Sequence, residues 1–215
     1  MQRLTEELIQ AGWAGRVLAK TQLARLLKGT PQRRYNLVNR ALRHGELLRL
    51  RRGLYVLAPA REGKVPHPFV LAQALQPGSY VSFETALSFH GWIPESATVT
   101  MSVIPGRRRL ELEPSSLGLF RFVPLALRRG YFLEAVDRVE LAGQVALVAQ
   151  PLRALADLIC LRKLQSGSIA LFTRSMRIDA ERLARTRPAE WRALERVYTH
   201  KRMAVAIREL KETVA

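Results

Sequence analysis

The chain has 215 residues, of which 48% are hydrophobic and 25% charged, the composition of an ordinary globular protein with enough length to bury a core. Thirty-five Lys and Arg against eighteen Asp and Glu give a net charge of +17, which favours a polyanionic partner. The single cysteine, Cys160, excludes an intramolecular disulfide and a cysteine-based zinc cluster, and its apolar surroundings predict a buried, inert thiol.

The positive charge is concentrated near the N-terminus. Residues 1–66 carry fourteen Lys and Arg against four Asp and Glu, whereas the remaining 149 residues carry twenty-one against fourteen. No apolar run approaches the roughly 18–20 residues of a membrane span, and Glu6 and Glu7 argue against a signal peptide. We therefore expect a soluble, cytoplasmic protein.

Three helices and a ribbon are expected in the first sixty residues. Thr21 and Thr30 stand at N-cap positions, and a proline at the first position of the third helix is favourable. A two-stranded ribbon follows, with its turn at Arg52-Gly53. This order predicts a winged helix-turn-helix domain over residues 1–60. The expected helices are Leu4–Ala11, Gln22–Lys28 and a third from Pro31 to Gly45.

The third helix has one basic face. At about 100° per residue, a buried stripe is predicted from Tyr35, Val38, Ala41 and Leu42. The opposite side and flanks carry no acid, and Arg, Asn and Gln have the fork geometry that reads guanine and adenine edges. A merely solvated helix face is the alternative. The predicted DNA-reading residues of this helix are Gln32, Arg33, Arg34, Asn36, Asn39, Arg40 and Arg43.

The ribbon alternates apolar and basic residues. Leu48, Leu50, Leu54 and Val56 are predicted to face inward. The outward arginines suit DNA phosphates or a narrow minor groove, and a charged edge strand that resists aggregation is the alternative. The predicted contacts from the ribbon are Arg49, Arg51 and Arg52.

Residues 61–215 are predicted to form a mixed α+β domain with a helical tail, after a linker that includes residues 58–63. No internal repeat is found. Helices are expected at Phe69–Leu75, Phe83–Phe89 and Leu152–Lys163, and then from about Ile169 onward. The expected strands are Tyr80–Val81, Thr98–Ile104, Gly118–Val123, Tyr131–Leu133 and Val145–Ala149.

No motif for catalysis, metal binding or a cofactor is present, so no enzyme, metal or cofactor is expected. The strongest enzyme candidate is Glu84 with His90, joined by Asp157, but six positions on a helix place Glu84 and His90 on different faces. Ser82 is predicted to be an N-cap.

Two further basic clusters follow. Arg107, Arg108 and Arg109, on an expected hairpin, are either a secondary nucleic-acid contact or a solvated turn. Arginines in the tail could contact DNA phosphates or an acidic protein: Arg174, Arg177, Arg182, Arg185 and Arg187.

Four segments together resemble the AbiEi antitoxin family of bacterial type IV toxin–antitoxin systems, over roughly residues 10–165. They are LLRLRRGLYVLAP, YVSFETALSFHGWIPE, TVTMSVIPGRRR and VALVAQPLRALADLI. The second matches the family pattern S-x-E-S/T-A-L-x-x-H-G through Ser82, Glu84, Ala86, Leu87, His90 and Gly91. The fourth resembles P-E-R-A-L-x-D through Pro151, Arg153, Ala154, Leu155 and Asp157, with Leu152 where glutamate is usual.

The resemblance implies an N-terminal winged domain that binds inverted repeats in its own promoter and represses the operon. It also implies a C-terminal domain needed for antitoxin activity against a nucleotidyltransferase-like toxin, without a stable complex. The alternative from another class is an interaction module whose basic surface binds an acidic protein or structured RNA.

Overall fold

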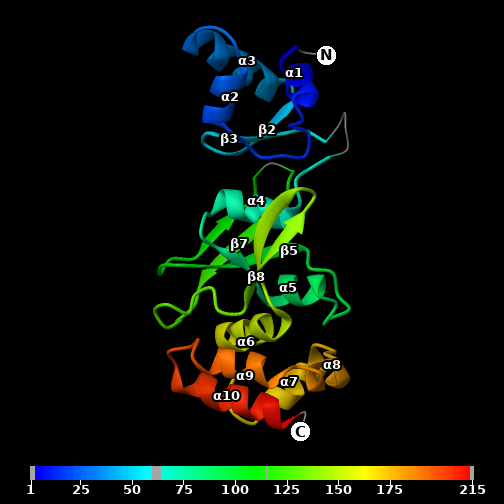
Figure 1. The fold of residues 1–215 in the computed structure, drawn as a ribbon, viewed down its shortest axis with the longest axis vertical. Helices are drawn as coiled ribbons and strands as arrows, with labels where there is room; N and C mark the ends of the chain where they lie inside the picture. The colour runs from blue at the N-terminus through cyan, green and yellow to red at the C-terminus, as the bar shows by residue number, and fades with distance from the viewer. Residues whose placement is uncertain (1–2, 60–63, 115, 214–215) are drawn as a thin grey trace.

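The computed structural model describes residues 3–59, 64–114 and 116–213, which form a mixed α+β structure. The molecule is elongated: helices and a small sheet lie at one end, a larger sheet lies in the middle, and helices form the other end (Figure 1). The α+β class expected from the sequence is therefore confirmed. The expected domain boundary between residues 60 and 61 lies outside the described residues.

The N-terminal part has the three expected helices and the expected two-stranded hairpin, with one short strand, Leu18–Ala19, that was not predicted between the first two helices. Thr30 caps the third helix, because its Oγ1 accepts the backbone N–H of Arg33 at 3.3 Å, and Pro31 is the first helical residue. The second helix begins at Lys20, earlier than expected, with Ala19 rather than Thr21 at the N-cap. The elements are α1 (Arg3–Gln10), β1 (Leu18–Ala19), α2 (Lys20–Leu26), α3 (Pro31–Arg43), β2 (Leu47–Arg51) and β3 (Leu54–Leu57).

The three strands form an antiparallel sheet in the order β1-β3-β2, and the β2–β3 hairpin turns at Arg52-Gly53 as expected. Gly53 has φ +82°, a left-handed conformation that a tight hairpin requires and that glycine adopts at low cost.

The hairpin contributes to two hydrophobic cores. Leu47 and Leu57 are buried with the helices of the N-terminal part. Leu50 and Val56 are buried on the other side, in the large core that includes helix α4 (Pro68–Leu75), and Leu48 and Leu54 pack against the same core. The four residues predicted to face inward therefore do pack in a core, but it is the core of the C-terminal part and not that of the N-terminal helices.

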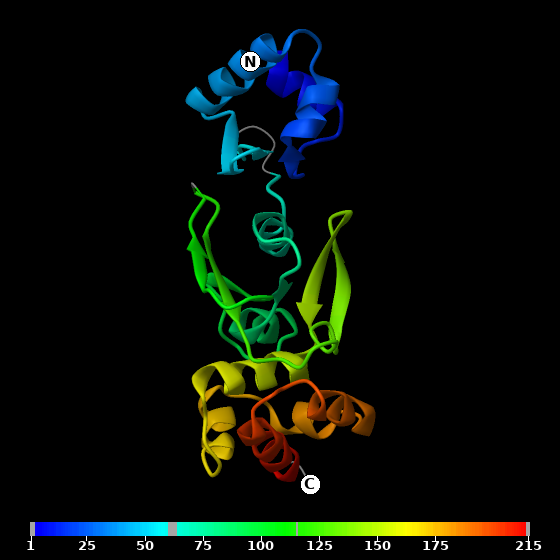
Figure 2. The ribbon, with the colours of Figure 1, turned by 90° about the vertical axis from the view of Figure 1, so that its left-hand side faces the viewer.

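The middle of the molecule is a mixed six-stranded sheet, counted over the residues that the structure describes, with strand order β6-β7-β5-β4-β9-β8. Figure 2 shows this sheet curving around α4, with β5 to β7 on one side and the β8–β9 hairpin on the other. The sheet is formed by β4 (Tyr80–Val81), β5 (Val99–Ile104), β6 (Leu110–Leu112), β7 (Leu119–Pro124), β8 (Val136–Leu141) and β9 (Gln144–Ala149).

Two predictions for this sheet were wrong. The segment Tyr131–Leu133, predicted to be a strand, lies in turns. Strand β8 begins only at Val136, where apolar and charged residues alternate. The segment with Arg107, Arg108 and Arg109 is not the tip of a hairpin, because β7 lies between β5 and β6 and pairs with both.

The C-terminal part is helical, as expected. Helix α10 buries Met203, Ala206, Ile207 and Leu210, one stripe at helical spacing that packs on α6, α7 and α9. Helix α5 (Phe83–Phe89) packs on α6 and on β5. The tail helices are α6 (Pro151–Arg162), α7 (Ile169–Ser175), α8 (Ala180–Ala184), α9 (Pro188–Glu195) and α10 (Lys201–Glu212). No helix of the described residues is long and apolar enough to cross a membrane.

Truncating Val56 to alanine should test the shared hairpin. Val56 is fully buried in the core that includes α4, so Val56→Ala should lower the free energy of unfolding by about 1–3 kcal/mol, measured by urea denaturation. The same change at Val145, which is 46% exposed, should cost less than about 0.5 kcal/mol. Equal stabilities of the two variants would contradict the packing described above.

Candidate nucleic-acid interface

Most of the residues predicted to read DNA are exposed on helix α3. Gln32, Arg33, Asn36, Arg40 and Arg43 all have exposed side chains. Gln32 Nε2 donates to Asn36 Oδ1 at 3.2 Å, so these two amides lie side by side on the outer surface. Five of the seven predicted helix residues thus lie on a solvent-facing surface.

The buried side of α3 differs from the prediction at three positions. Tyr35, predicted to be buried, is 63% exposed, and Arg34, predicted to contact DNA, donates from Nη1 to the Ala24 carbonyl of α2 at 2.7 Å. Leu37, not included in the predicted stripe, packs into the N-terminal core beside the fully buried Ala41. The stripe is centred nearer Ala41 than predicted, which turns Arg34 inward and Tyr35 outward.

A groove runs between α3 and the β2–β3 hairpin. One hollow of about 430 Å³ has Lys20, Tyr35, Asn39, Arg49 and Tyr55 in its wall, together with apolar residues of α2. A second hollow shares Tyr35, Asn39 and Arg49 and adds Arg43. The structure therefore brings Asn39, Arg43 and Arg49 together, as the DNA-binding prediction requires. Lys20, Tyr35 and Tyr55 were missed.

The other predicted arginines surround this groove. Arg51 and Arg52 are exposed at the tip of the hairpin. Arg33 lies on another side of α3, where it lines a hollow with Glu7 and Lys28 from α1 and the turn after α2. The predicted arginines thus lie on α3 and on the hairpin, with Arg33 on the side of α3 that faces α1.

The two ends of the molecule differ in how their arginines are neutralised. In the tail, Arg177 pairs with Glu95, and Arg185 and Arg187 pair with glutamates of their own segments. Arg182 donates to the backbone carbonyls of His90 and Gly91, at the C-terminal end of α5. Within the described residues, by contrast, no arginine of α3 or of the hairpin forms an ion pair with a carboxylate. Among the residues that the structure describes, the arginines of α3 and of the hairpin therefore keep their positive charge without a paired carboxylate.

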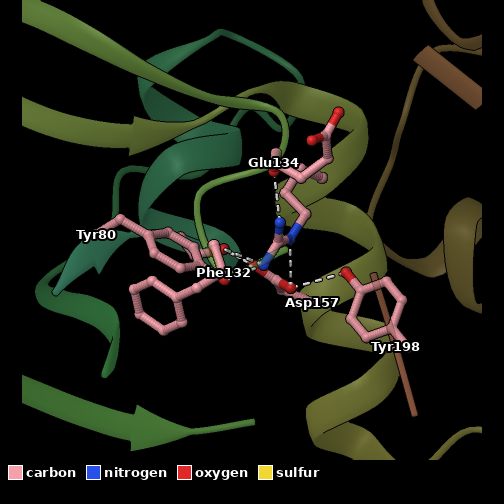
Figure 3. A network of polar contacts seen from close by, with 7 residues as sticks. Tyr80, Phe132, Glu134, Asp157 and Tyr198 are labelled. Atoms are coloured by element: carbon pink, nitrogen blue, oxygen red, sulfur yellow. Dashed lines mark hydrogen bonds and ion pairs between the residues drawn. The ribbon is translucent and has the colours of Figure 1, made fainter. Parts of the chain in front are cut away.

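Three residues of the motifs quoted above, Ser82, Arg153 and Asp157, meet in a buried polar network, shown in Figure 3. Asp157 accepts hydrogen bonds from the hydroxyl groups of Ser82 (2.7 Å), Tyr80 (3.0 Å) and Tyr198 (2.7 Å). Arg153 pairs with the same carboxylate at 2.9 Å, and both side chains are fully buried. Ser82 stands at the N-cap position of α5, as predicted, but its hydroxyl donates to Asp157 and makes no cap hydrogen bond to the helix.

The rest of the Arg153 guanidinium is also satisfied. It donates to the Tyr80 hydroxyl and to the carbonyls of Phe132 and Glu134, which precede β8. Burial lowers the pKa of Arg153, but the Asp157 carboxylate together with Tyr198 and Tyr80 outweighs this, and the net shift of the pKa is upward. Burial, with Asp157, raises the pKa of Tyr80 and of Tyr198 well above the ordinary value, so both remain neutral donors at neutral pH.

The three residues of the enzyme hypothesis have separate partners. Glu84 pairs with Arg162 at 2.6 Å, the His90 ring contacts the Ala149 carbonyl at 2.9 Å, and Asp157 belongs to the buried network. Burial lowers the pKa of His90. Cys160 is buried, as predicted, and burial raises the pKa of its thiol to about 11. Among the described residues, no group of His, Cys, Asp and Glu side chains could hold a metal ion.

The comparisons with known proteins bear on the fold. No protein-family model and no curated protein matches the sequence. Among solved structures, the chain is similar to the crystal structure of the RV2827C protein from Mycobacterium tuberculosis, with a TM-score of 0.51 and 17% sequence identity. The match covers 99% of this chain and 79% of that chain. At this identity the likeness shows a shared α+β fold alone.

Removing the charge of Asp157 should be strongly destabilising. Asp157→Asn would leave the buried Arg153 cation without its counter-charge, so the free energy of unfolding should fall by about 3–5 kcal/mol in urea denaturation. Glu111→Gln makes the corresponding change in the exposed ion pair of Glu111 with Arg121. It should lower the free energy of unfolding by less than about 1 kcal/mol. If Asp157→Asn proves as stable as Glu111→Gln, the network does not hold the fold together.

Proposed function

We propose that this chain is a DNA-binding transcriptional repressor of its own operon and the antitoxin of a type IV toxin–antitoxin pair. The observation that carries the DNA-binding part is the unneutralised charge on α3 and the hairpin. Because these arginines form no ion pair with a described carboxylate, a polyanion that binds them has no such pair to break.

The local architecture supports the same proposal. Helix α2, a turn with Gly29 at φ +104°, helix α3 and the β2–β3 hairpin follow one another in the order of a winged helix-turn-helix. In that arrangement, α3 enters the major groove of the operator and the hairpin arginines Arg51 and Arg52 contact phosphates or the minor groove. Operator DNA with inverted repeats is the proposed ligand.

The antitoxin part of the proposal rests on the resemblance of the matched segments, and its functional partner would be a nucleotidyltransferase-like toxin. The motif residues Ser82, Arg153 and Asp157 are buried and bonded to one another. We therefore assign them a positioning role in the C-terminal part and not contact with a toxin. A toxin would act on surfaces that this scaffold holds in place, with no stable complex expected.

Binding to the upstream region of the chain's own gene, measured by fluorescence anisotropy, tests the proposal. The triple variant Arg40→Ala, Arg49→Ala, Arg51→Ala removes exposed side chains that make no hydrogen bond among the described residues, so the fold should persist. Affinity should fall by about 100-fold or more, since each base or phosphate contact is worth roughly 1–3 kcal/mol. The dependence on salt should also become shallower.

A matched control removes three arginines that are already paired: Arg177→Ala, Arg185→Ala, Arg187→Ala. It changes the net charge equally and should bind nearly as well as the wild type. Equal losses of affinity for the two triple variants would show that the protein binds the duplex only by non-specific charge attraction. Tighter binding to structured RNA or to an acidic protein than to the upstream duplex would favour the interaction-module alternative.

A further inference from the structure

Tyr35 is exposed to an extent that its chemistry does not favour. Its side chain is 63% exposed, more than any other large hydrophobic side chain of the described residues 3–59. Within the described residues its hydroxyl makes no hydrogen bond that would hold the ring at the surface. An aromatic ring in this position adds nothing to the core and presents an apolar face to whatever α3 meets.

The neighbours of Tyr35 define what that face could contact. Asn39, one turn further along α3, lines both hollows of the groove with Tyr35 and Arg49. Gln32, one turn earlier, lines one of them, but its amide nitrogen already donates to Asn36. Tyr35 also lies in the first half of α3, the part of a recognition helix whose side chains reach base edges.

An apolar ring beside an amide matches one base pair in particular. In the major groove, a T·A pair displays the 5-methyl group of thymine next to the N6 donor and N7 acceptor of adenine. The methyl group favours an apolar contact, and an asparagine amide suits the adenine edge. Other base pairs lack the methyl group and so give the ring nothing apolar to cover.

We infer that Tyr35 is a specificity-determining residue that contacts the 5-methyl group of a thymine in the operator, with Asn39 beside it at the paired adenine. This inference rests on the proposed DNA-binding function and adds one base preference to it. The ring, and not the hydroxyl, provides the contact.

Replacing single thymines by deoxyuridine isolates this contact, because uracil pairs identically and lacks only the methyl group. Duplexes of the upstream region, each with one such replacement, are titrated by anisotropy with wild type, Tyr35→Phe and Tyr35→Ala. At one thymine of each half-site, wild type and Tyr35→Phe should lose about fourfold in affinity, the value of one buried methyl group. Tyr35→Ala should bind the two duplexes equally. Because Tyr35 is exposed, all three proteins should have the same circular dichroism.

Arg51→Ala provides the control, since loss of an exposed hairpin cation should weaken binding to every duplex and leave the deoxyuridine effect intact. The inference is overturned if no replacement affects the wild type, or if Tyr35→Ala keeps the fourfold effect. It is also overturned if Tyr35→Phe weakens binding to every duplex without a deoxyuridine effect, which would assign the hydroxyl to a phosphate. A wild type with no preference for the upstream region over random duplex overturns the proposed function itself, and this inference with it.

Discussion

The buried ion pair of Arg153 and Asp157 is the interaction on which the C-terminal two thirds of the molecule depends. It joins α6 to β4 through Tyr80, to the segment before β8 through backbone carbonyls, and to the segment before α10 through Tyr198. A charged pair without water is stable only when its remaining donors and acceptors are satisfied, and here they are bonded to residues from four parts of the chain. The network therefore favours one arrangement of the sheet and tail helices over its alternatives.

Charge is used differently at the two ends of the chain. In the tail, Arg177, Arg185 and Arg187 are bonded to glutamates and Arg182 to backbone carbonyls, so these four arginines contribute little to the outward field of the molecule. Around α3, exposed arginines stand beside amides and one exposed tyrosine, with no carboxylate partner among the described residues. The sequence already shows a higher density of positive charge near the N-terminus, and the contacts add that several tail arginines are paired whereas those of α3 and the hairpin are not, among the described residues.

The sequence was sufficient where local rules decide the structure. Thr30 and Pro31 predict the start of α3, and Arg52-Gly53 predicts the hairpin turn, because capping and turn geometry depend on a few adjacent residues. The predicted buried side of α3 differs from the observed one by part of a turn. The Arg34 guanidinium donates to a backbone carbonyl of α2, a contact that helix periodicity cannot indicate. Tyr198 could not be predicted as a partner of Asp157, 41 residues away, because tertiary packing alone brings them together.

The hairpin that separates two hydrophobic cores has a consequence for protein engineering. The side of the hairpin that carries Arg49 and Tyr55 borders the groove beside α3. The other side, with Leu50 and Val56, is buried against α4. A chimera that joined the first sixty residues to another C-terminal part would lack α4, against which Leu50 and Val56 are buried. Such a graft should therefore carry α4 with it, or redesign Leu50 and Val56 for a solvent-facing strand. The contact between the hairpin and α4 therefore limits how freely the N-terminal part can be exchanged in this fold.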